Sequence, residues 1–207
     1  MNVWLLLVFC YLLGSLSGSM ILGKFRGVDI RTLGSGNAGG TNAFRTQGIR
    51  FALGVVIIDV GKGVLAAYVA QKLFGASHDA VYLAVFITVV GHIWPIFHGF
   101  RGGKGAATLV GGLCLAWPQS LILLFVVWFF NLMLTGYVGL STVLAALSLV
   151  FSAYLFDADA TQWQFAVASA MLLTYSHRSN LQRTWQGSES CFEKARVLGR
   201  LFFPKRG

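Results

Sequence analysis

The sequence predicts an all-helical integral membrane protein with seven transmembrane helices. Of its 207 residues, 56% are hydrophobic and only 11% are charged, whereas soluble domains carry about 25% charged residues. The apolar residues fall in long runs separated by short basic segments. This pattern indicates a surface that faces lipid, and the chain length predicts a single membrane-embedded domain over residues 1–207.

Four apolar runs are clear candidates for membrane spans. Each is close to the ~20 residues that a helix needs to cross a bilayer. No basic residue precedes the first run, so we expect a retained helix there and not a cleaved signal peptide. The four runs are Val3–Leu22, Phe51–Phe74, Ala80–Phe97 and Thr161–Ser176.

The uncharged stretch from Ala106 to Phe156 holds either two spans or three, since Pro118 and the glycines at 136 and 139 are plausible helix ends. Of the 16 Lys and Arg residues, five follow the first run, two follow the third and seven follow the last. Only three spans put all of these on one side, as the positive-inside rule requires. The sequence therefore predicts seven helices, an outer N-terminus and an inner C-terminus, with short helices near the inner face. The fourth, near residues 105–117, is short for a full crossing.

This topology brings three polar segments to the same inner face. They are Gly23–Arg50, His98–Gly105 and His177–Gly187. Together they contain most of the residues that are unusual in a membrane protein, so we expect them to form one site.

The first polar segment has the composition of an anion-binding loop. Glycines let backbone N–H groups approach an anion closely, and Ser, Thr and Asn add neutral donors. An arginine adds a planar fork that suits phosphate oxygens. The alternative is a flexible loop whose charges set the topology. The candidate ligands here are Ser35, Gly36, Asn37, Thr41 and Arg45, with Ser35 also a candidate catalytic residue.

The second and third segments add further candidates. Gly103 and Lys104 precede a predicted helix start, where exposed amides and a lysine can bind an anion. A tight turn with topology-setting charge explains that segment equally well. His177 and Asn180 are three residues apart and share a face at a helical end, and the histidine can exchange a proton. For this segment alone, an ordinary polar helix terminus is the simpler interpretation.

Two ionisable residues interrupt the second apolar run. Asp59 and Lys62 lie three residues apart and can pair, which limits the cost of burial. A functional role and a role in helix packing are equally open. His92, in the third run, is expected to be a packed, hydrogen-bonded core histidine.

Charge and cysteine usage exclude several other classes. The net charge is +9, but the basic residues lie between apolar runs. They therefore favour anionic ligands and membrane lipid head groups over nucleic acid. The three cysteines make neither a disulfide framework nor a metal pair, so we expect no metal and no cofactor.

The motifs resemble those of the bacterial acyl-phosphate:glycerol-3-phosphate acyltransferases, the PlsY family. The resemblance rests on DIRTLGSGNAGGTNAFR, DVGKG, GHIWPIFHGFRGGKGAAT and HRSNLQR, in that order over the whole chain. It implies acyl transfer from acyl phosphate to the 1-hydroxyl of glycerol 3-phosphate, which gives lysophosphatidic acid and phosphate. It also implies a seven-span protein of the bacterial inner membrane with a cytoplasmic site. We further expect a monomer, supplied by an enzyme that forms acyl phosphate.

Other classes remain as alternatives. A transporter of a phosphorylated metabolite usually carries an internal repeat with a site near the bilayer midplane. The sequence shows no repeat, and its polar groups gather at one interface. A lipid-binding adaptor needs only diffuse Lys and Arg, and does not require Asn, Thr and Gly at fixed spacing.

Overall fold

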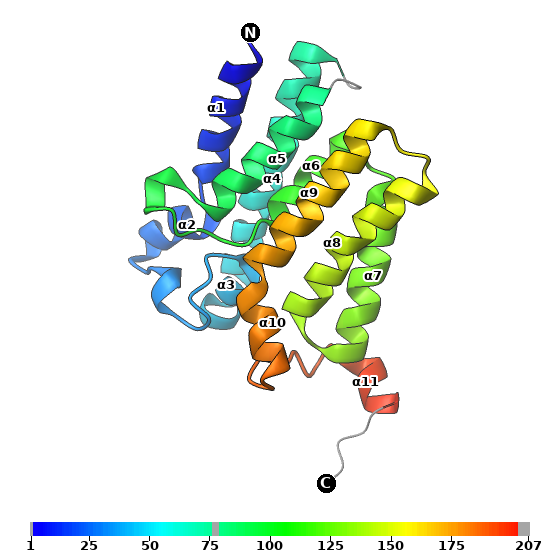
Figure 1. The fold of residues 1–207 in the computed structure, drawn as a ribbon. Helices are drawn as coiled ribbons and strands as arrows, with labels where there is room; N and C mark the ends of the chain where they lie inside the picture. Colours follow the sequence, from blue (N-terminus) through cyan, green and yellow to red (C-terminus); the bar gives the residue numbers. More distant parts are fainter. Residues whose placement is uncertain (1, 76–78, 203–207) are drawn as a thin grey trace. The chain divides into compact units, whose positions relative to one another are not determined.

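The computed structural model describes residues 2–75 and 79–202, and the regular structure in these ranges is entirely helical (Figure 1). The all-helical prediction is therefore confirmed. The chain divides into two compact units, residues 1–118 and 119–207. Each unit contains part of the predicted site, and each is described by itself below.

The first unit is built on a long helix, α4, that packs against α6, α5, α3 and α2. Helix α1 packs beside α5, as the blue and green ribbons show in Figure 1. Two short 3-10 helices, η1 and η2, lie in the polar segments. The elements of this unit are α1 (Val3–Ser15), α2 (Gly18–Arg26), η1 (Ile30–Thr32), α3 (Gly40–Gln47), α4 (Ile49–Phe74), α5 (Asp79–Ile93), η2 (Ile96–His98) and α6 (Ala106–Ala116).

The first apolar run is not one continuous helix. It forms α1 and α2, which are bent by 41° at a short break. Leu16 at the end of α1 has extended backbone angles, φ −74° and ψ 100°. Just before it, a Cβ on Gly14 would meet the backbone carbonyl of Thr88 on α5. The prediction of a single helix over 3–22 is therefore wrong. Close packing of α1 on α5 is followed by a break in the helix, and backbone carbonyl groups at this break accept hydrogen bonds from outside α1 and α2.

Within residues 2–75 and 79–202, three helical stretches are long and apolar enough to cross a membrane. They are α4, the stretch from Asp79 to His98, and α8 (Val138–Leu155), and the bent α1–α2 pair would make a fourth. Helix α6 has 11 residues, so it is about 16 Å long, against roughly 30 Å for a bilayer core. Its short length agrees with the sequence-based expectation. The uncharged stretch forms three helices, interrupted around Pro118 and Gly136 as predicted.

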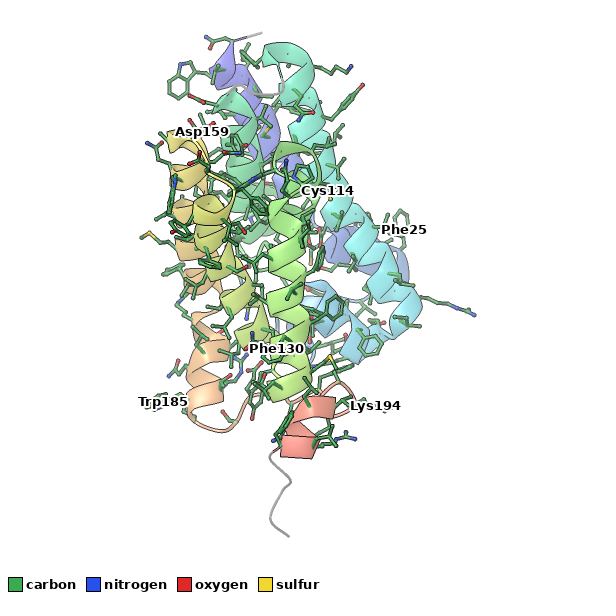
Figure 2. All side chains as sticks on the ribbon, turned by 90° about the vertical axis from the view of Figure 1, so that its right-hand side faces the viewer. Phe25, Cys114, Phe130, Asp159, Trp185 and Lys194 are labelled. Atoms are coloured by element: carbon green, nitrogen blue, oxygen red, sulfur yellow. The ribbon has the colours of Figure 1, made fainter. Side chains whose placement is uncertain are left out.

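The second unit packs α8 against α7 and α9, with α11 against α7 and α10 against α8. Asp159 starts α9 with a capping box, in which its carboxylate and the side chain of Gln162 satisfy each other's backbone N–H groups. Aromatic side chains such as Phe130 and Trp185 are exposed (Figure 2). The helices of this unit are α7 (Ser120–Thr135), α8 (Val138–Leu155), α9 (Ala160–Ser176), α10 (Arg178–Trp185) and α11 (Val197–Phe202).

Candidate active site

The glycine-rich loop before α3 is organised by one buried amide, that of Asn42. Its side-chain oxygen accepts the N–H of Ser35 at 3.0 Å. Its nitrogen lies within reach of three carbonyl oxygens, at 3.2 Å for Ile30, 2.9 Å for Leu33 and 3.0 Å for Asn37. Because one side chain meets the loop at four points, the loop has a defined shape and is not merely flexible.

Two glycines are required by the path of this loop. Gly34 and Gly36 have φ values of +56° and +71°, in the region that L side chains rarely adopt. A Cβ on Gly34 would also meet the Asn42 side-chain oxygen. The positive φ values turn the chain so that Ser35 and Gly36 stay exposed above the buried amide.

Helix α3 carries the next two candidate ligands on one face. Thr41 lies in its first turn and Arg45 one turn later, a spacing that aligns side chains on a helix. Asn37 and Thr41 are half-buried and Arg45 is exposed. The start of α3 therefore combines helix-end amides, a hydroxyl and a guanidinium, which are the groups that bind phosphate.

An arginine outside the predicted set joins the first and second polar segments. The Arg31 guanidinium donates to both carboxylate oxygens of Asp29, at 2.8–3.2 Å, and to the backbone carbonyl of His98 at 2.9 Å. Hydrogen bonding from Arg31 holds the pKa of the Asp29 carboxyl below its ordinary value. Within the first unit, the structure thus brings together two of the three segments that the sequence singled out.

The turn that carries Lys104 is anchored to the end of α5. The Gly102 N–H donates to the Ile93 carbonyl and the Gly103 N–H to the His92 carbonyl, both at 3.2 Å. Gly105 then takes a φ of +88° as the cap of α6. Lys104 is half-buried at this turn, directly before the start of a helix, as predicted.

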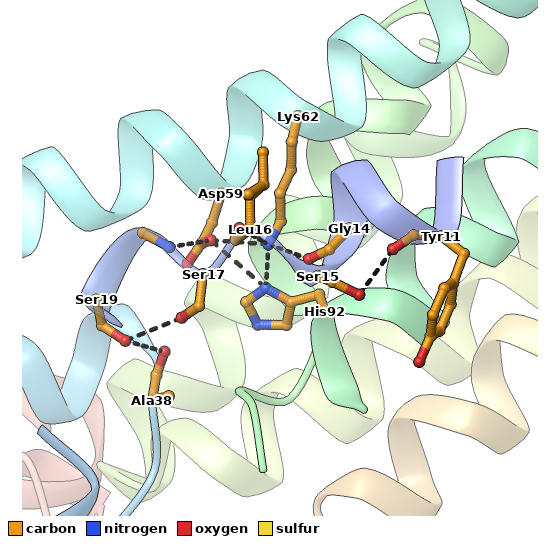
Figure 3. Close-up of polar contacts among 11 residues, drawn as sticks. Tyr11, Gly14, Ser15, Leu16, Ser17, Ser19, Ala38, Asp59, Lys62 and His92 are labelled. Atoms are coloured by element: carbon orange, nitrogen blue, oxygen red, sulfur yellow. Dashed lines mark hydrogen bonds and ion pairs between the residues drawn. The ribbon is translucent and has the colours of Figure 1, made fainter. Parts of the chain in front are cut away.

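The ionisable pair of the second apolar run is buried. Lys62 Nζ lies 3.1 Å from the Asp59 carboxylate and 2.7 Å from Nδ1 of His92, the three residues being 1–4% exposed (Figure 3). The predicted pairing is confirmed, and so is the expectation that His92 is a packed, hydrogen-bonded core residue.

His177 lies in the second unit, between α9 and α10, at the helical end that was predicted. It is 6% exposed, and its Nδ1 lies 2.9 Å from the carbonyl oxygen of Leu173. A carbonyl only accepts, so Nδ1 carries the proton. In the neutral ring Nε2 is then the nitrogen with the lone pair.

Asn180 is held by a buried acid that the sequence reasoning missed. Its amide nitrogen donates to Glu189 at 2.6 Å, and Arg183 Nε donates to the other Glu189 oxygen at 2.7 Å. A Cβ on Gly139 of α8 would meet the Asn180 side chain. The signal available in the sequence was the position of Glu189, an acidic residue in a strongly basic C-terminal stretch. In the structure its carboxylate is 9% exposed, and a buried carboxylate needs hydrogen-bond partners.

No group of three or more His, Cys, Asp or Glu residues with the arrangement of a metal site occurs in residues 2–75 and 79–202. The groups that the structure gathers are amides, hydroxyls, guanidinium and ammonium groups. These suit anions, and phosphate in particular.

Comparison with known proteins agrees with this chemistry. A family model described as glycerol-3-phosphate acyltransferase matches residues 4–187. A glycerol-3-phosphate acyltransferase of Aquifex aeolicus (strain VF5) is 33% identical over 192 residues, covering 93% of this chain and 100% of the relative. One from Halalkalibacterium halodurans is 38% identical over 193 residues, covering 90% of this chain and 94% of the relative.

Solved structures agree as well. Crystal structures of PlsY, described as an integral membrane glycerol 3-phosphate acyltransferase, match in a glycerol 3-phosphate form and a lysophosphatidic acid form. Their TM-scores are 0.88 and 0.86, at 33% identity, covering 95% of this chain and 98% of theirs. The chain therefore belongs to the glycerol-3-phosphate acyltransferase family and is an integral membrane protein.

Proposed function

We propose that this protein transfers a fatty acyl group from acyl phosphate to the 1-hydroxyl of glycerol 3-phosphate. The products are 1-acylglycerol 3-phosphate (lysophosphatidic acid) and inorganic phosphate. The observation that carries the proposal is the Arg31 link, which ties the glycine-rich loop to the segment bearing Lys104. Two anion-binding segments in one unit suit a reaction whose two substrates both carry phosphate.

We assign the acyl-donor phosphate to the glycine-rich loop. Gly36 lies in a turn with positive φ, where its lack of a side chain lets a phosphate approach the backbone, and the side chains of Ser35, Asn37 and Thr41 add neutral donors. Neutral donors match a phosphate that must leave during the reaction, because they bind it without the full attraction of a cation.

We assign the phosphate of glycerol 3-phosphate to the cationic side chains Arg45 and Lys104, with the Gly103 backbone beside them. This substrate phosphate is retained in the product. Replacing Arg45 or Lys104 by alanine should raise the KM for glycerol 3-phosphate at least about tenfold, because each removes a charge-assisted hydrogen bond of about 1.5–3 kcal/mol. Arg50→Ala is the matched control, since Arg50 is an exposed arginine of the same segment. An unchanged KM in both variants would overturn the assignment.

The chemistry needs positioning more than activation, because an acyl phosphate is already a reactive donor. The 1-oxygen of the acceptor forms a bond to the acyl carbon, and the bond from that carbon to the phosphate oxygen breaks. The proton of the attacking hydroxyl passes to the departing phosphate, whose second pKa is about 6, or to Nε2 of His177. We assign to His177 and Asn180 the orientation of the reacting groups.

Ser35 has a narrower role in this scheme. We treat it as a phosphate ligand and not as a covalent nucleophile, because no acidic residue near it in the sequence orients a base. An acyl-enzyme that is trapped in the unmodified protein and absent in Ser35→Ala would reverse this assignment.

We further propose seven spans, with an outer N-terminus and the site at the cytoplasmic face of the bacterial inner membrane. The asymmetry of Lys and Arg along the chain supports this orientation. A reporter fused after Lys205 should be found inside. A reporter at the same junction found on the outer face would contradict the proposed topology.

The decisive experiment supplies purified protein with acyl phosphate and labelled glycerol 3-phosphate, and detects labelled lysophosphatidic acid. Parallel reactions contain acyl-CoA or acyl-carrier protein as the donor. Product from acyl phosphate alone supports the whole proposal. Product from another donor alone corrects the donor, and no product from any donor contradicts the enzymatic function.

The break between α1 and α2 is the feature that favours the alternative, a transporter of a phosphorylated metabolite, because transporters bind ions at broken helices. Proteoliposomes distinguish the two. Uptake of labelled glycerol 3-phosphate without an acyl donor, together with absence of acyl transfer, would support transport.

A further inference from the structure

A buried polar cluster lies in the first unit, made of Asp59 and Lys62 on α4 and His92 on α5. The Asp59 carboxylate lies 3.1 Å from Lys62 Nζ and 3.5 Å from His92 Nδ1. Burying such a group is costly unless each polar atom has a partner. The partners of this cluster show what it holds in place.

Lys62 stabilises the break between α1 and α2. Its ammonium group donates to the carbonyl oxygens of Gly14 and Leu16, both at 2.8 Å, and to His92 Nδ1 at 2.7 Å (Figure 3). An ammonium group has three N–H donors, and with Asp59 at 3.1 Å four acceptors surround it, so its donors are fully used. The two carbonyls are among those left without helical partners where α1 ends.

These contacts fix the protonation of His92. Because Lys62 can only donate, Nδ1 of His92 must be the acceptor and Nε2 must carry the proton. The contacts of the ring with Lys62 and Asp59 are both made by Nδ1. Figure 3 shows Nε2 pointing away from Lys62 and Asp59.

The Nε2 edge of the ring faces the turn that carries Lys104. A Cβ placed on Gly103 would collide with Nε2 and would lie 2.9 Å from Cε1 of His92. The same residue donates its N–H to the His92 carbonyl at 3.2 Å. The φ of Gly103 lies outside the left-handed region, so the ring of His92, and not the backbone conformation, is what excludes a side chain there.

The other side of the cluster reaches the glycine-rich loop. The Asp59 carboxylate accepts the N–H of Gly18, the first residue of α2, at 3.2 Å. Next to it, the Ser19 hydroxyl donates to the carbonyl of Ala38 at 2.9 Å. The cluster is thus continuous by contact with the turn at Gly103 on one side and with the loop at Ala38 on the other.

We propose that His92, held by Lys62 and Asp59, is a positioning residue for glycerol 3-phosphate. It acts through Gly103 and sets where the Lys104 ammonium and the adjacent amides meet the substrate phosphate. The proposal rests on the proposed function, which assigns that phosphate to Lys104. It gives a role in the reaction to three residues that otherwise look like a stabilising salt-bridge cluster.

The test is a double-mutant cycle between Gly103→Ala and His92→Asn. Asparagine keeps an oxygen that can accept from Lys62 but lacks the ring atoms that meet a Cβ at position 103. Gly103→Ala alone should raise the KM for glycerol 3-phosphate about tenfold or more, with kcat and the KM for the acyl donor changed less than about threefold, since only the turn moves. In the Gly103→Ala/His92→Asn double variant, the KM for glycerol 3-phosphate should be within about threefold of the KM of the single variant His92→Asn.

Gly102→Ala is the matched control for this cycle. Its Cβ would collide with the backbone carbonyl of His92, which His92→Asn does not remove. The defect of Gly102→Ala should therefore persist in the Gly102→Ala/His92→Asn double variant. Val85→Ala controls for loss of packing, since Val85 lies buried on α5 two turns before His92 and against Gly112. It should lower the melting temperature and leave the KM for glycerol 3-phosphate unchanged.

Additive effects of Gly103→Ala and His92→Asn on the KM for glycerol 3-phosphate would overturn the proposal. So would a fall in kcat and a rise in both KM values by similar factors. If Gly103→Ala does not fold, His92→Asn alone decides. A raised KM for glycerol 3-phosphate with the KM of the donor unchanged supports the proposal, and no change contradicts it. Glycerol 3-phosphate binding is also followed by its effect on the melting temperature, which needs no acyl donor. Acyl transfer by the unmodified protein therefore tests the proposed function separately.

Discussion

The glycine-rich loop of the first unit and Asn180 of the second unit are held by different means. In the first unit the neutral side chain of Asn42 contacts four backbone groups and shapes the glycine-rich loop. In the second unit the Glu189 carboxylate binds two side chains, Asn180 and Arg183. One network fixes a backbone without charge, whereas the other fixes side chains with a charge.

The difference matters for anion binding. A carboxylate under the glycine-rich loop would repel the phosphate that the loop is proposed to bind, while a neutral amide does not. Beside Asn180 a carboxylate is tolerable because Arg183 pairs with it. The comparison predicts that the first network is sensitive to loss of shape and the second to loss of charge.

The largest effect is expected from Asn42→Ala. This change removes the side-chain partner of the Ser35 N–H and of the Asn37 carbonyl, each at a cost of about 1–3 kcal/mol if water cannot replace it. The Ile30 and Leu33 carbonyls still accept backbone N–H groups. Displacement of the loop should lower kcat/KM on the order of 100-fold or more, measured by product formation from labelled glycerol 3-phosphate. Asn131→Ala is the control, because that amide donates to the Val127 carbonyl of its own helix and not to a loop. Near-normal activity of Asn42→Ala would show that the loop does not depend on this amide.

A smaller effect is expected from Glu189→Gln, which keeps the size of the side chain and removes its charge. Glutamine can accept from Asn180 through its oxygen, but its NH₂ group then faces the Arg183 Nε donor. Loss of one charge-assisted hydrogen bond, about 1.5–3 kcal/mol, should lower kcat roughly 10- to 100-fold. Asp157→Asn is the control, since Asp157 is an exposed carboxylate of the same unit. Equal kcat values for Glu189→Gln and Asp157→Asn would show that the second network does not depend on the charge of Glu189.

The helices of this fold were largely predictable, because apolar runs mark where helices form and residues such as Pro118 and Gly136 mark where they end. Both are local features of the sequence. The phosphate candidates of the first two segments were found by composition, and the structure brings those segments together. Which residue organises each segment was not predictable. Asn42 and Asn37 look equivalent in the sequence, yet only Asn42 is 1% exposed beneath the loop.

The break between α1 and α2 escaped prediction for a related reason. Hydropathy reports how well a segment partitions into lipid, and the glycines and serines at positions 14–19 of the first run carry no charge that would interrupt it. The break is stabilised by Lys62, which lies 46 residues beyond Leu16 in the chain. Partners that are this distant in sequence leave no local signal.

A modest effect is expected from Arg31→Lys, which tests the link between the two segments of the first unit. A lysine ammonium cannot reproduce the planar fork that contacts both Asp29 and the His98 carbonyl. We expect the KM for glycerol 3-phosphate to rise about two- to fivefold, roughly 1 kcal/mol or less, as for other partly exposed pairs. An unchanged KM would mean that the His98 contact does not position the Lys104 turn.

The smallest effect is expected on the pH dependence of stability, through the ion pair of Arg31 with Asp29. Hydrogen bonding from Arg31 lowers the pKa of Asp29 in the folded protein. The stability that this carboxylate contributes is therefore fully present above its ordinary pKa of about 3.9, and it is lost as the pH falls through the lower folded pKa.

The difference in unfolding midpoint between the unmodified protein and Asp29→Asn should stay constant from about pH 5 upward and shrink below about pH 4. Because the pair is partly exposed, added salt should reduce the difference as well. A difference that grew on acidification would require Asp29 to be stabilised in its protonated form. The contact between Asp29 and Arg31 would then not depend on the charge of Asp29, and the first unit would differ even more from the second, where the Glu189 network depends on charge.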